Sequence, residues 1–221
     1  PQVIKSSLLA PLQEGDEIFN TLDDAPESTN LAGTSETFNK LQKRMKNEVL
    51  RIRMPNKHAK KTYDDKLVPG ITIDKNKLNN GAGVHLYNGK WEWVPEFSLL
   101  NADKTILGKQ ISVKTIPIKK NTGVLFSGYL LVPHSGEWTF HCESSGQFIF
   151  KIHKKLVLDA DYKYDGTEIS TTLKLNKGIH PYRMYYKDSS SKPDINLQWE
   201  SGNLAKSPIP AKALFVNDQS L

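Results

Sequence analysis

The stretch "GEWTFHCESSGQFIFKIHKKLVLDADYKYDG", residues 136–166, decides the fold class. Aromatic and β-branched residues alternate with polar ones on both sides of Ser144–Ser145–Gly146, which predicts two strands joined by a tight turn. The same stretch holds Cys142, the only cysteine, so no disulfide bond can form within the chain. Whether the Ser-Ser-Gly turn is only a turn or also a ligand site is the question that this stretch raises.

The β pattern continues on both sides of this stretch. From Ile71 onward, short runs rich in Val, Ile, Phe, Tyr, Trp and Thr recur at roughly the 8–12-residue spacing of sandwiches and barrels. We therefore expect a mainly β protein, with an antiparallel β-sandwich over residues 71–216. Its expected strands are 124–133, 137–143, 147–153, 155–160, 169–175, 180–187 and 195–201. Its expected aromatic core is Phe126, Tyr129, Trp138, Phe140, Phe148, Phe150, Tyr182, Tyr185 and Trp199.

The N-terminal residues have a different pattern. Residues 1–33 are acidic and rich in turn formers, whereas residues 34–53 carry an apolar stripe at helical spacing. Thr34 or Ser35 can cap this helix, and Pro55 follows its end. The stripe consists of Phe38, Leu41, Met45, Val49 and Ile52. We expect a helix-bearing segment over residues 1–53 and a charged linker over 54–70.

Charge and composition limit the possible partners. The 221 residues are 38% hydrophobic and 24% charged, which is enough to bury a core. The net charge of +6 favours anionic partners such as sulfated glycans, but no long Lys/Arg run is present, and we expect no nucleic-acid partner. No apolar run approaches the roughly 18 residues of a membrane span, so we expect no membrane-spanning segment.

Several segments of residues 70–216 resemble, in order, the protective-antigen β-sandwich family (the "PA-fourteen" module). "GAGVHLYNGKWEWVPEF" at 81–97 is similar to the opening of that family, and 124–161 is similar to its core signature. "LNKGIHPYRMYYKD" at 175–188 and "INLQWES" at 195–201 are similar to its later strands. The resemblance implies a β-sandwich that in some members binds sugars.

A second resemblance covers about residues 8–52. "DEIFNTLDDAPESTNLAGTSETFNKLQKRM" looks like the tail of sulfatase catalytic domains, with one inserted residue before Pro26. This resemblance implies that the chain is the C-terminal part of a sulfatase-like enzyme, whose catalytic machinery would precede Pro1. The alternative is a generic acidic turn followed by a helix.

We expect no catalysis by this chain. Sulfatases use a Cys or Ser within Cys/Ser-x-Pro-x-Arg, and Cys142 has neither the proline nor the arginine. We expect Cys142 to be a small buried strand residue. No two of the six histidines have the i, i+4 spacing of a zinc helix.

The turn at Ser144, Ser145 and Gly146 bears on calcium. In calcium-dependent sugar binders of the resembled family, two adjacent aspartates precede the glycine of this turn. Calcium prefers several hard oxygen ligands, above all carboxylates, and hydroxyls bring no charge. We therefore expect no metal site here and no cofactor in this chain. Nearby carboxylates, Glu143, Asp159, Asp161 and Asp165, either form a different site or are solvated.

Six residues are candidates for carbohydrate binding: Trp91, Trp93, Lys151, His153, Lys155 and Asp161. Lys151, His153 and Lys155 occupy every second position, so a single strand would place them on one basic face. Trp91 and Trp93 would likewise share a face and could stack on a sugar ring. The alternatives are exposed surface lysines and core-packed tryptophans.

Together these features predict a non-catalytic accessory module that binds carbohydrate. The parent would be a periplasmic or extracellular sulfatase-like enzyme that acts on sulfated glycans, and its catalytic domain would be a further partner. Two alternatives stay open: a structural packing module without a ligand, and an accessory domain of a glycosidase.

Overall fold

The computed structural model of the chain describes residues 2–5, 17–24, 26–54, 66–118, 121–188, 190 and 192–217. The described residues divide into two compact units, one before and one after the boundary between Met54 and Pro55. Most of the expected linker, residues 55–65, lies outside the described residues. Within the described ranges, none of the helices combines the length and apolar character that a membrane crossing requires.

The first unit has a two-stranded antiparallel sheet and one helix. Strands β1 (Gln2–Lys5) and β2 (Glu17–Asn20) pair, and α1 spans Glu36–Arg53. Ser35 caps the helix, since its Oγ accepts a hydrogen bond from the N–H of Phe38 at 3.3 Å. The predicted helix is thus confirmed. None of its residues is buried, and Ile52 on the apolar stripe is 70% exposed.

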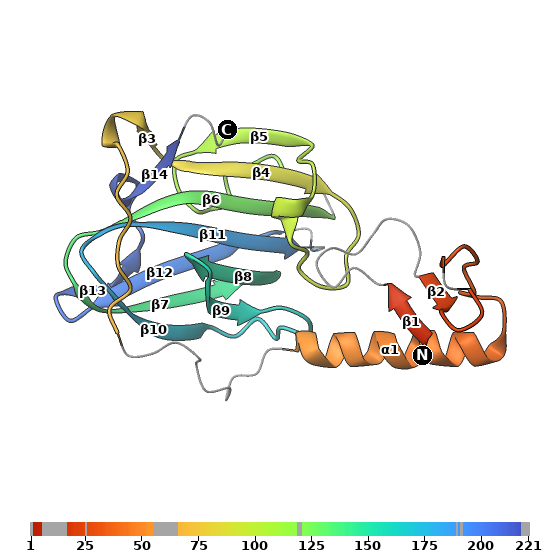
Figure 1. The fold of residues 1–221 in the computed structure, drawn as a ribbon. Coiled ribbons are helices and arrows are strands. Elements are labelled where there is room, and N and C mark those ends of the chain that lie inside the picture. Colours follow the sequence, from red (N-terminus) through yellow and green to blue (C-terminus); the bar gives the residue numbers. More distant parts are fainter. Residues whose placement is uncertain are drawn as a thin grey trace. The chain divides into compact units, whose positions relative to one another are not determined.

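The second unit is an antiparallel β-sandwich, as expected (Figure 1). The smaller sheet has the order β10-β7-β12-β13, and the larger one has the order β3-β14-β6-β11-β8-β9, in which β4 also pairs with β6 and β5 pairs with β4. The smaller sheet consists of β10 (Ile169–Leu175), β7 (Gly136–Ser144), β12 (Ile195–Ser201) and β13 (Leu204–Pro208). The larger sheet consists of β3 (Leu78–Asn80), β4 (Ala82–Asn88), β5 (Lys104–Gly108), β6 (Thr122–Val132), β8 (Gln147–Ile152), β9 (Lys155–Ala160), β11 (Gly178–Asp188) and β14 (Leu214–Asn217). Three short 3-10 helices, η1 (Lys75–Lys77), η2 (Phe97–Leu99) and η3 (Ala211–Ala213), lie in the connections.

Strand β6 is the centre of the larger sheet. One edge of β6 pairs with β11 along its whole length. Its other edge is shared, because β4 pairs with residues 122–127 and β14 pairs with residues 129–130. The second strand of the unit, β4, and its last strand, β14, therefore pair with the same strand.

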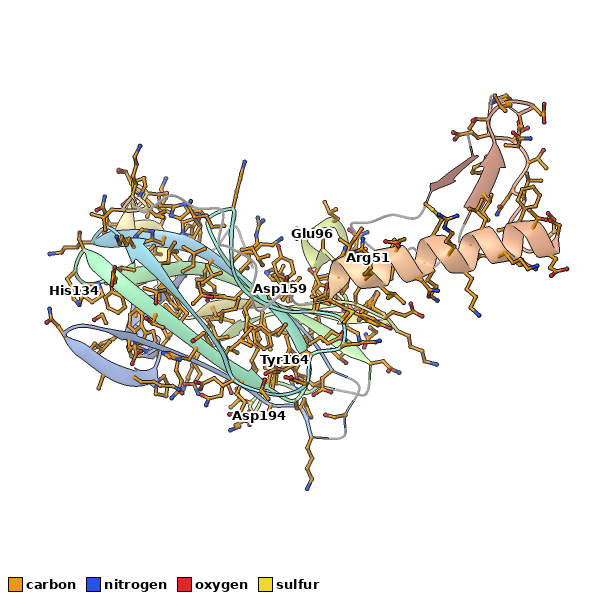
Figure 2. The ribbon with its side chains drawn as sticks, turned by 90° about the horizontal axis from the view of Figure 1, so that it is seen from below. Arg51, Glu96, His134, Asp159, Tyr164 and Asp194 are labelled. Atoms are coloured by element: carbon orange, nitrogen blue, oxygen red, sulfur yellow. The ribbon has the colours of Figure 1, made fainter. Side chains whose placement is uncertain are left out.

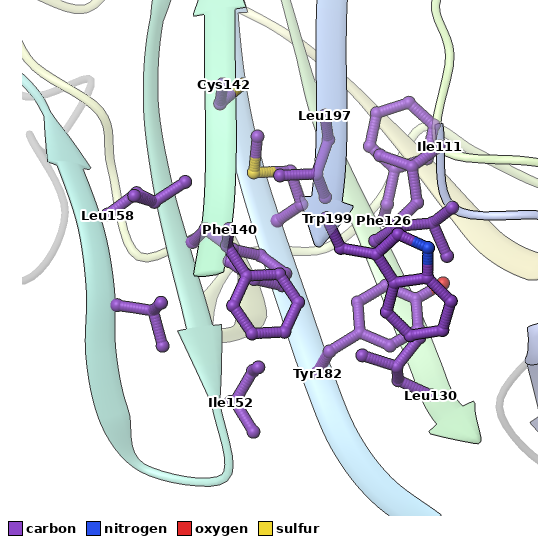
Figure 3. Close-up of a cluster of buried hydrophobic side chains, with 14 of the residues drawn as sticks. Ile111, Phe126, Leu130, Phe140, Cys142, Ile152, Leu158, Tyr182, Leu197 and Trp199 are labelled. Atoms are coloured by element: carbon purple, nitrogen blue, oxygen red, sulfur yellow. The ribbon is translucent and has the colours of Figure 1, made fainter. Parts of the chain in front are cut away.

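The main core lies between the two sheets (Figure 3). In β7, Trp138, Phe140 and Cys142 point inward, as period-two alternation predicts. Facing side chains come from β6, β8 and β11. Cys142 is fully buried, as expected, and burial raises the pKa of its thiol well above its usual value. The thiol is therefore a packing group.

A second, smaller core covers the outer face of the larger sheet. It consists of Tyr87, Val94, Phe97, Leu125 and Tyr185, with Trp91 packed against it. Leu125 lies on the opposite side of β6 from its neighbours Val124 and Phe126, which belong to the main core. The residues 89–103 that connect β4 to β5 supply Val94 and Phe97, so this segment covers part of the outer face.

Candidate functional site

The Ser144–Ser145–Gly146 turn forms a dense hydrogen-bond network. Ser145 Oγ donates to Asp188 Oδ2 at 2.5 Å and accepts from the N–H of Asp194 at 2.7 Å. Ser144 Oγ donates to the carbonyl of Asp194 at 3.0 Å. The two hydroxyls thus tie the β7–β8 turn to the connection between β11 and β12. Figure 2 shows Asp194 toward one end of the sandwich and His134 at the other.

Asp188 is the charged member of this network. Burial acts to raise the pKa of its carboxyl, but hydrogen bonds from Ser145, Ser190 and Tyr186 outweigh burial and hold the pKa below its usual range. The carboxylate is thus satisfied by protein donors. Within the ranges that the structure describes, no group of three or more His, Cys, Asp or Glu side chains is placed to hold a metal ion.

The expected basic face is not formed. Lys151 is the second-to-last residue of β8, Lys155 begins β9, and the chain reverses between them at His153 and Lys154. Lys151 Nζ instead lies 2.8 Å from Glu96 Oε2 and 4.8 Å from the centre of the Tyr185 ring. The prediction of one shared strand face is wrong, because Lys151 and Lys155 lie on different strands, where Lys151 pairs with Leu156 and Lys155 pairs with Ile152.

The two tryptophans and Asp161 hold the 89–103 segment. Trp91 packs edge-on against Phe97, with ring centres 5.3 Å apart, and Trp93 is only 7% exposed. Neither lies on a strand, so the expected stacking face is absent. Asp161 is 2% exposed, and its Oδ1 accepts the N–H of Val94 at 2.7 Å. These three candidates are therefore packing and anchoring residues of the segment.

The structure instead places a groove of about 580 Å³ on the uncovered part of the same outer face. We call it the outer groove. It lies beside the second core and crosses β4, β6 and β11. Its lining residues are His85, Tyr87, Ser98, Leu125, Ser127, Gly128, Tyr129, His153, Lys154, Pro181, Tyr182 and Arg183.

The polar side chains of the outer groove are hydroxyls and imidazoles, which can donate or accept, and two cations, which only donate. His85 bridges Thr105 Oγ1 at 3.1 Å and Ser127 Oγ at 3.0 Å, and burial lowers the pKa of its ring. Arg183 and Lys154 are exposed, and no carboxylate is among the lining residues. Tyr129, expected in the core, is half-buried and contributes a ring to the groove. The groove therefore suits hydroxylated or anionic ligands.

A histidine pair borders this groove at the β8–β9 turn. His153 Nε2 lies 3.0 Å from His180 Nδ1, and His180 Nε2 lies 2.9 Å from the carbonyl oxygen of Asn176. His180 is fully buried, and the pKa of each ring is lowered, in both cases mainly by burial. Of the six predicted site residues, only His153 lines the outer groove.

Comparison with known proteins supports the fold. A family model described as the PA14 domain matches residues 80–212. The PA14 domain of the antifreeze protein MpAFP is 15% identical, with a TM-score of 0.55 over 72% of this chain and 99% of that one. Epithelial adhesin 9 from Candida glabrata, solved with Galβ1-3GlcNAc, is 13% identical, with a TM-score of 0.55 over 69% of this chain and 96% of that one.

A third solved structure is an anti-sigma factor domain-containing protein. It is 22% identical, with a TM-score of 0.53 over 62% of this chain, and the match spans about half (49%) of that protein's length. A comparison with curated protein sequences finds no match. Because the family model covers well over half of the chain, the conclusion is that this chain belongs to the PA14 domain family.

Proposed function

We propose that the sandwich is a non-catalytic carbohydrate-binding module and that the outer groove holds the saccharide. The observation that carries this proposal is the lining of the groove, which combines the Tyr129 ring with hydrogen-bonding side chains and two exposed cations. Sugars are bound through such mixtures of an aromatic surface and a few placed polar groups. The epithelial adhesin with a similar fold was solved with a bound disaccharide, which supports a saccharide as the ligand class.

The charge of the groove favours an anionic saccharide. Arg183 and Lys154 bring two positive charges, and the lining has no carboxylate to oppose them. Arginine binds sulfate and carboxylate groups with paired, charge-assisted hydrogen bonds. We extend the proposal to sulfated polysaccharides and to a sulfatase-like parent enzyme outside the cytoplasm. The order of motifs in residues 8–52 supports that parent.

One observation favours a second role for the first unit. Two residues of the apolar stripe of α1 are exposed, Met45 at 39% and Ile52 at 70%. Exposed apolar stripes of this kind commonly mark contact surfaces. A structural role, in which α1 packs on another protein part, is therefore the alternative to a purely ligand-binding chain.

Substituting Arg183 tests the groove. Arg183→Ala in the full chain should weaken binding of a sulfated oligosaccharide about tenfold, because one charge-assisted contact is lost. Arg44→Ala removes an exposed arginine from α1 and gives the same net charge, so it should bind like the wild type. Affinity electrophoresis and titration calorimetry on a panel of neutral and sulfated glycans provide the readout. Failure of the wild-type chain to bind any glycan would refute the function, and equal loss in both variants would refute the site.

We also propose that binding does not require calcium. The hydroxyls of Ser144 and Ser145 are used in hydrogen bonds, and Asp188 already accepts hydrogen bonds from Ser145, Tyr186 and Ser190. A ligand that binds only the folded state raises its stability by mass action, so millimolar calcium should leave the melting temperature equal to that in EDTA. A clear rise in the melting temperature, or glycan binding that EDTA abolishes, would contradict this expectation.

A further inference from the structure

We propose that the outer groove contains a proton-linked anion subsite formed by His153, Lys154 and Arg183. In this subsite the His153–His180 pair takes up one proton when a sulfate or carboxylate group of the saccharide binds. The inference rests on the proposed function, since it assigns the ligand charge and the regulation of the same groove.

The hydrogen bonds fix which ring nitrogens carry protons. A carbonyl oxygen only accepts, so His180 Nε2 must donate to Asn176. In a neutral His180 ring, Nδ1 is then the acceptor, and His153 Nε2–H donates to it. His153 Nδ1 is left without a hydrogen bond to any of the described residues. When both rings are neutral, one basic nitrogen, His153 Nδ1, is therefore still available to take up a proton.

The pair can accept one proton but not two. A proton added to His153 Nδ1 makes that ring an imidazolium, and its Nε2–H still donates to His180, so the existing hydrogen bond is kept. A second proton on His180 Nδ1 would place two donors and two charges 3.0 Å apart. The second protonation is therefore opposed, and the pair gains a single positive charge.

The backbone at His153 also points to a role for its side chain. His153 has φ +53°, a left-handed conformation that favours Gly and Asn, and its N–H donates to the carbonyl of Pro181 at 2.7 Å. Strained positions of this kind cluster at ligand sites. The imidazole occupies a hairpin position that a glycine would fill with less strain.

The charges around His153 favour binding of an anion and oppose protonation of His153 without one. From the same hairpin, Lys154 and Lys155 are positive, and Lys151 is paired with Glu96. From β11, Arg183 is positive, and from β4 the His85 ring, whose pKa is lowered by burial, faces the groove. None of the residues lining the groove is an aspartate or a glutamate. Without a ligand, burial, His180 and Lys155 lower the pKa of His153, whereas a bound anion acts in the opposite direction.

The sign of the pH dependence follows from this. Because the pKa of the free pair is lowered and an anion raises it, acidification from pH 7.5 to 5.5 should strengthen anion binding. The positive charge that the histidine pair gains, at contact distance from the anion near the surface, corresponds to about a fivefold gain in affinity. By linkage, binding near pH 6 should take up protons.

The experiment compares three ligands with the full chain at constant ionic strength. They are a dextran sulfate oligosaccharide, an oligogalacturonate and neutral dextran. Affinity is measured at pH 7.5 and 5.5, and calorimetry at pH 6 in buffers of different ionisation enthalpy counts the protons taken up. The two anionic ligands separate a sulfate subsite from a carboxylate subsite, and neither titrates appreciably in this range.

We expect His153→Gln to lose the acid gain and the proton uptake, because its amide cannot take up a proton in this pH range. His141→Gln, on the outer face of the smaller sheet, should keep both. Histidine NMR titration of the wild type should show the His153 pKa rising when the anion binds. An acid gain that persists in His153→Gln, or binding without proton uptake, would overturn the proton linkage while leaving the proposed function intact. Absence of binding by all ligands at both pH values would overturn both.

Discussion

Replacing Gly146 with alanine should lower the free energy of unfolding by about 3 kcal/mol. Gly146 follows Ser145 in the turn between β7 and β8, where that turn meets the end of β11. An added Cβ would overlap the main-chain carbonyl oxygen of Lys187 and would lie 2.8 Å from Asp188 Cβ. These atoms belong to a paired strand and cannot rotate away, so the backbone of β11 must shift. Equilibrium unfolding in urea measures the loss.

The matched control is Gly202→Ala. Gly202 lies in the β12–β13 turn, and no atom comes within 4 Å of its added Cβ. Neither glycine has a positive φ, so the two substitutions differ in steric contact and not in backbone preference. Gly202→Ala should stay within about 0.5 kcal/mol of the wild type. Equal stability of the two variants would show that the close approach of the turn to β11 is not a constraint.

Replacing Phe97 with alanine should cost about 4 kcal/mol, within the range for large core aromatics. Phe97 is fully buried in the second core, and its ring stacks on Tyr87 at 4.7 Å and contacts Trp91 and Tyr185. Without this ring, the 89–103 segment loses its main anchor on the outer face. The Lys151–Glu96 ion pair, with side chains 28% and 21% exposed, and the Val94–Asp161 hydrogen bond remain, but neither replaces the apolar contact surface that the ring provides.

Leu99→Ala provides the comparison within the same short helix η2. Leu99 is 61% exposed, so its truncation removes little buried surface and should change stability by less than about 0.5 kcal/mol. Urea unfolding measures both variants, and limited proteolysis of the 89–103 segment reports whether it has detached. A small loss of stability in Phe97→Ala would mean that the second core is not a structural element of the sandwich.

The strands that pack against the main core could be predicted from sequence. In β7 buried aromatics alternate with polar residues, and in β8 Phe148, Phe150 and Ile152 are buried at every second position, so the period alone identifies each strand and its inner face. The short strands β3, β5, β13 and β14 have no such pattern, because their pairing depends on tertiary neighbours. Tyr129 was expected in the core from its size, yet it alternates with the inward-facing Leu130 and lies on the outer face.

The outer groove could not be predicted in the same way. Its residues come from β4, β6, β11 and the β8–β9 turn, and they meet only because β6 pairs with both β4 and β11. His153 and His180 are 27 residues apart in sequence, and nothing in their local segments indicates contact. The sequence predicts His153 as a carbohydrate-binding residue on a basic strand face. That face does not form, but His153 does line the outer groove.

The shared edge of β6 also has a consequence for how the sandwich forms during synthesis. Because β14 pairs with both β3 and β6, the larger sheet is completed only when residues 214–217 join segments made more than eighty residues earlier. Contacts so distant in sequence make folding slow. Until β14 has been synthesised, part of the β6 edge in the nascent chain is therefore unpaired. This free edge can pair with strands of other chains.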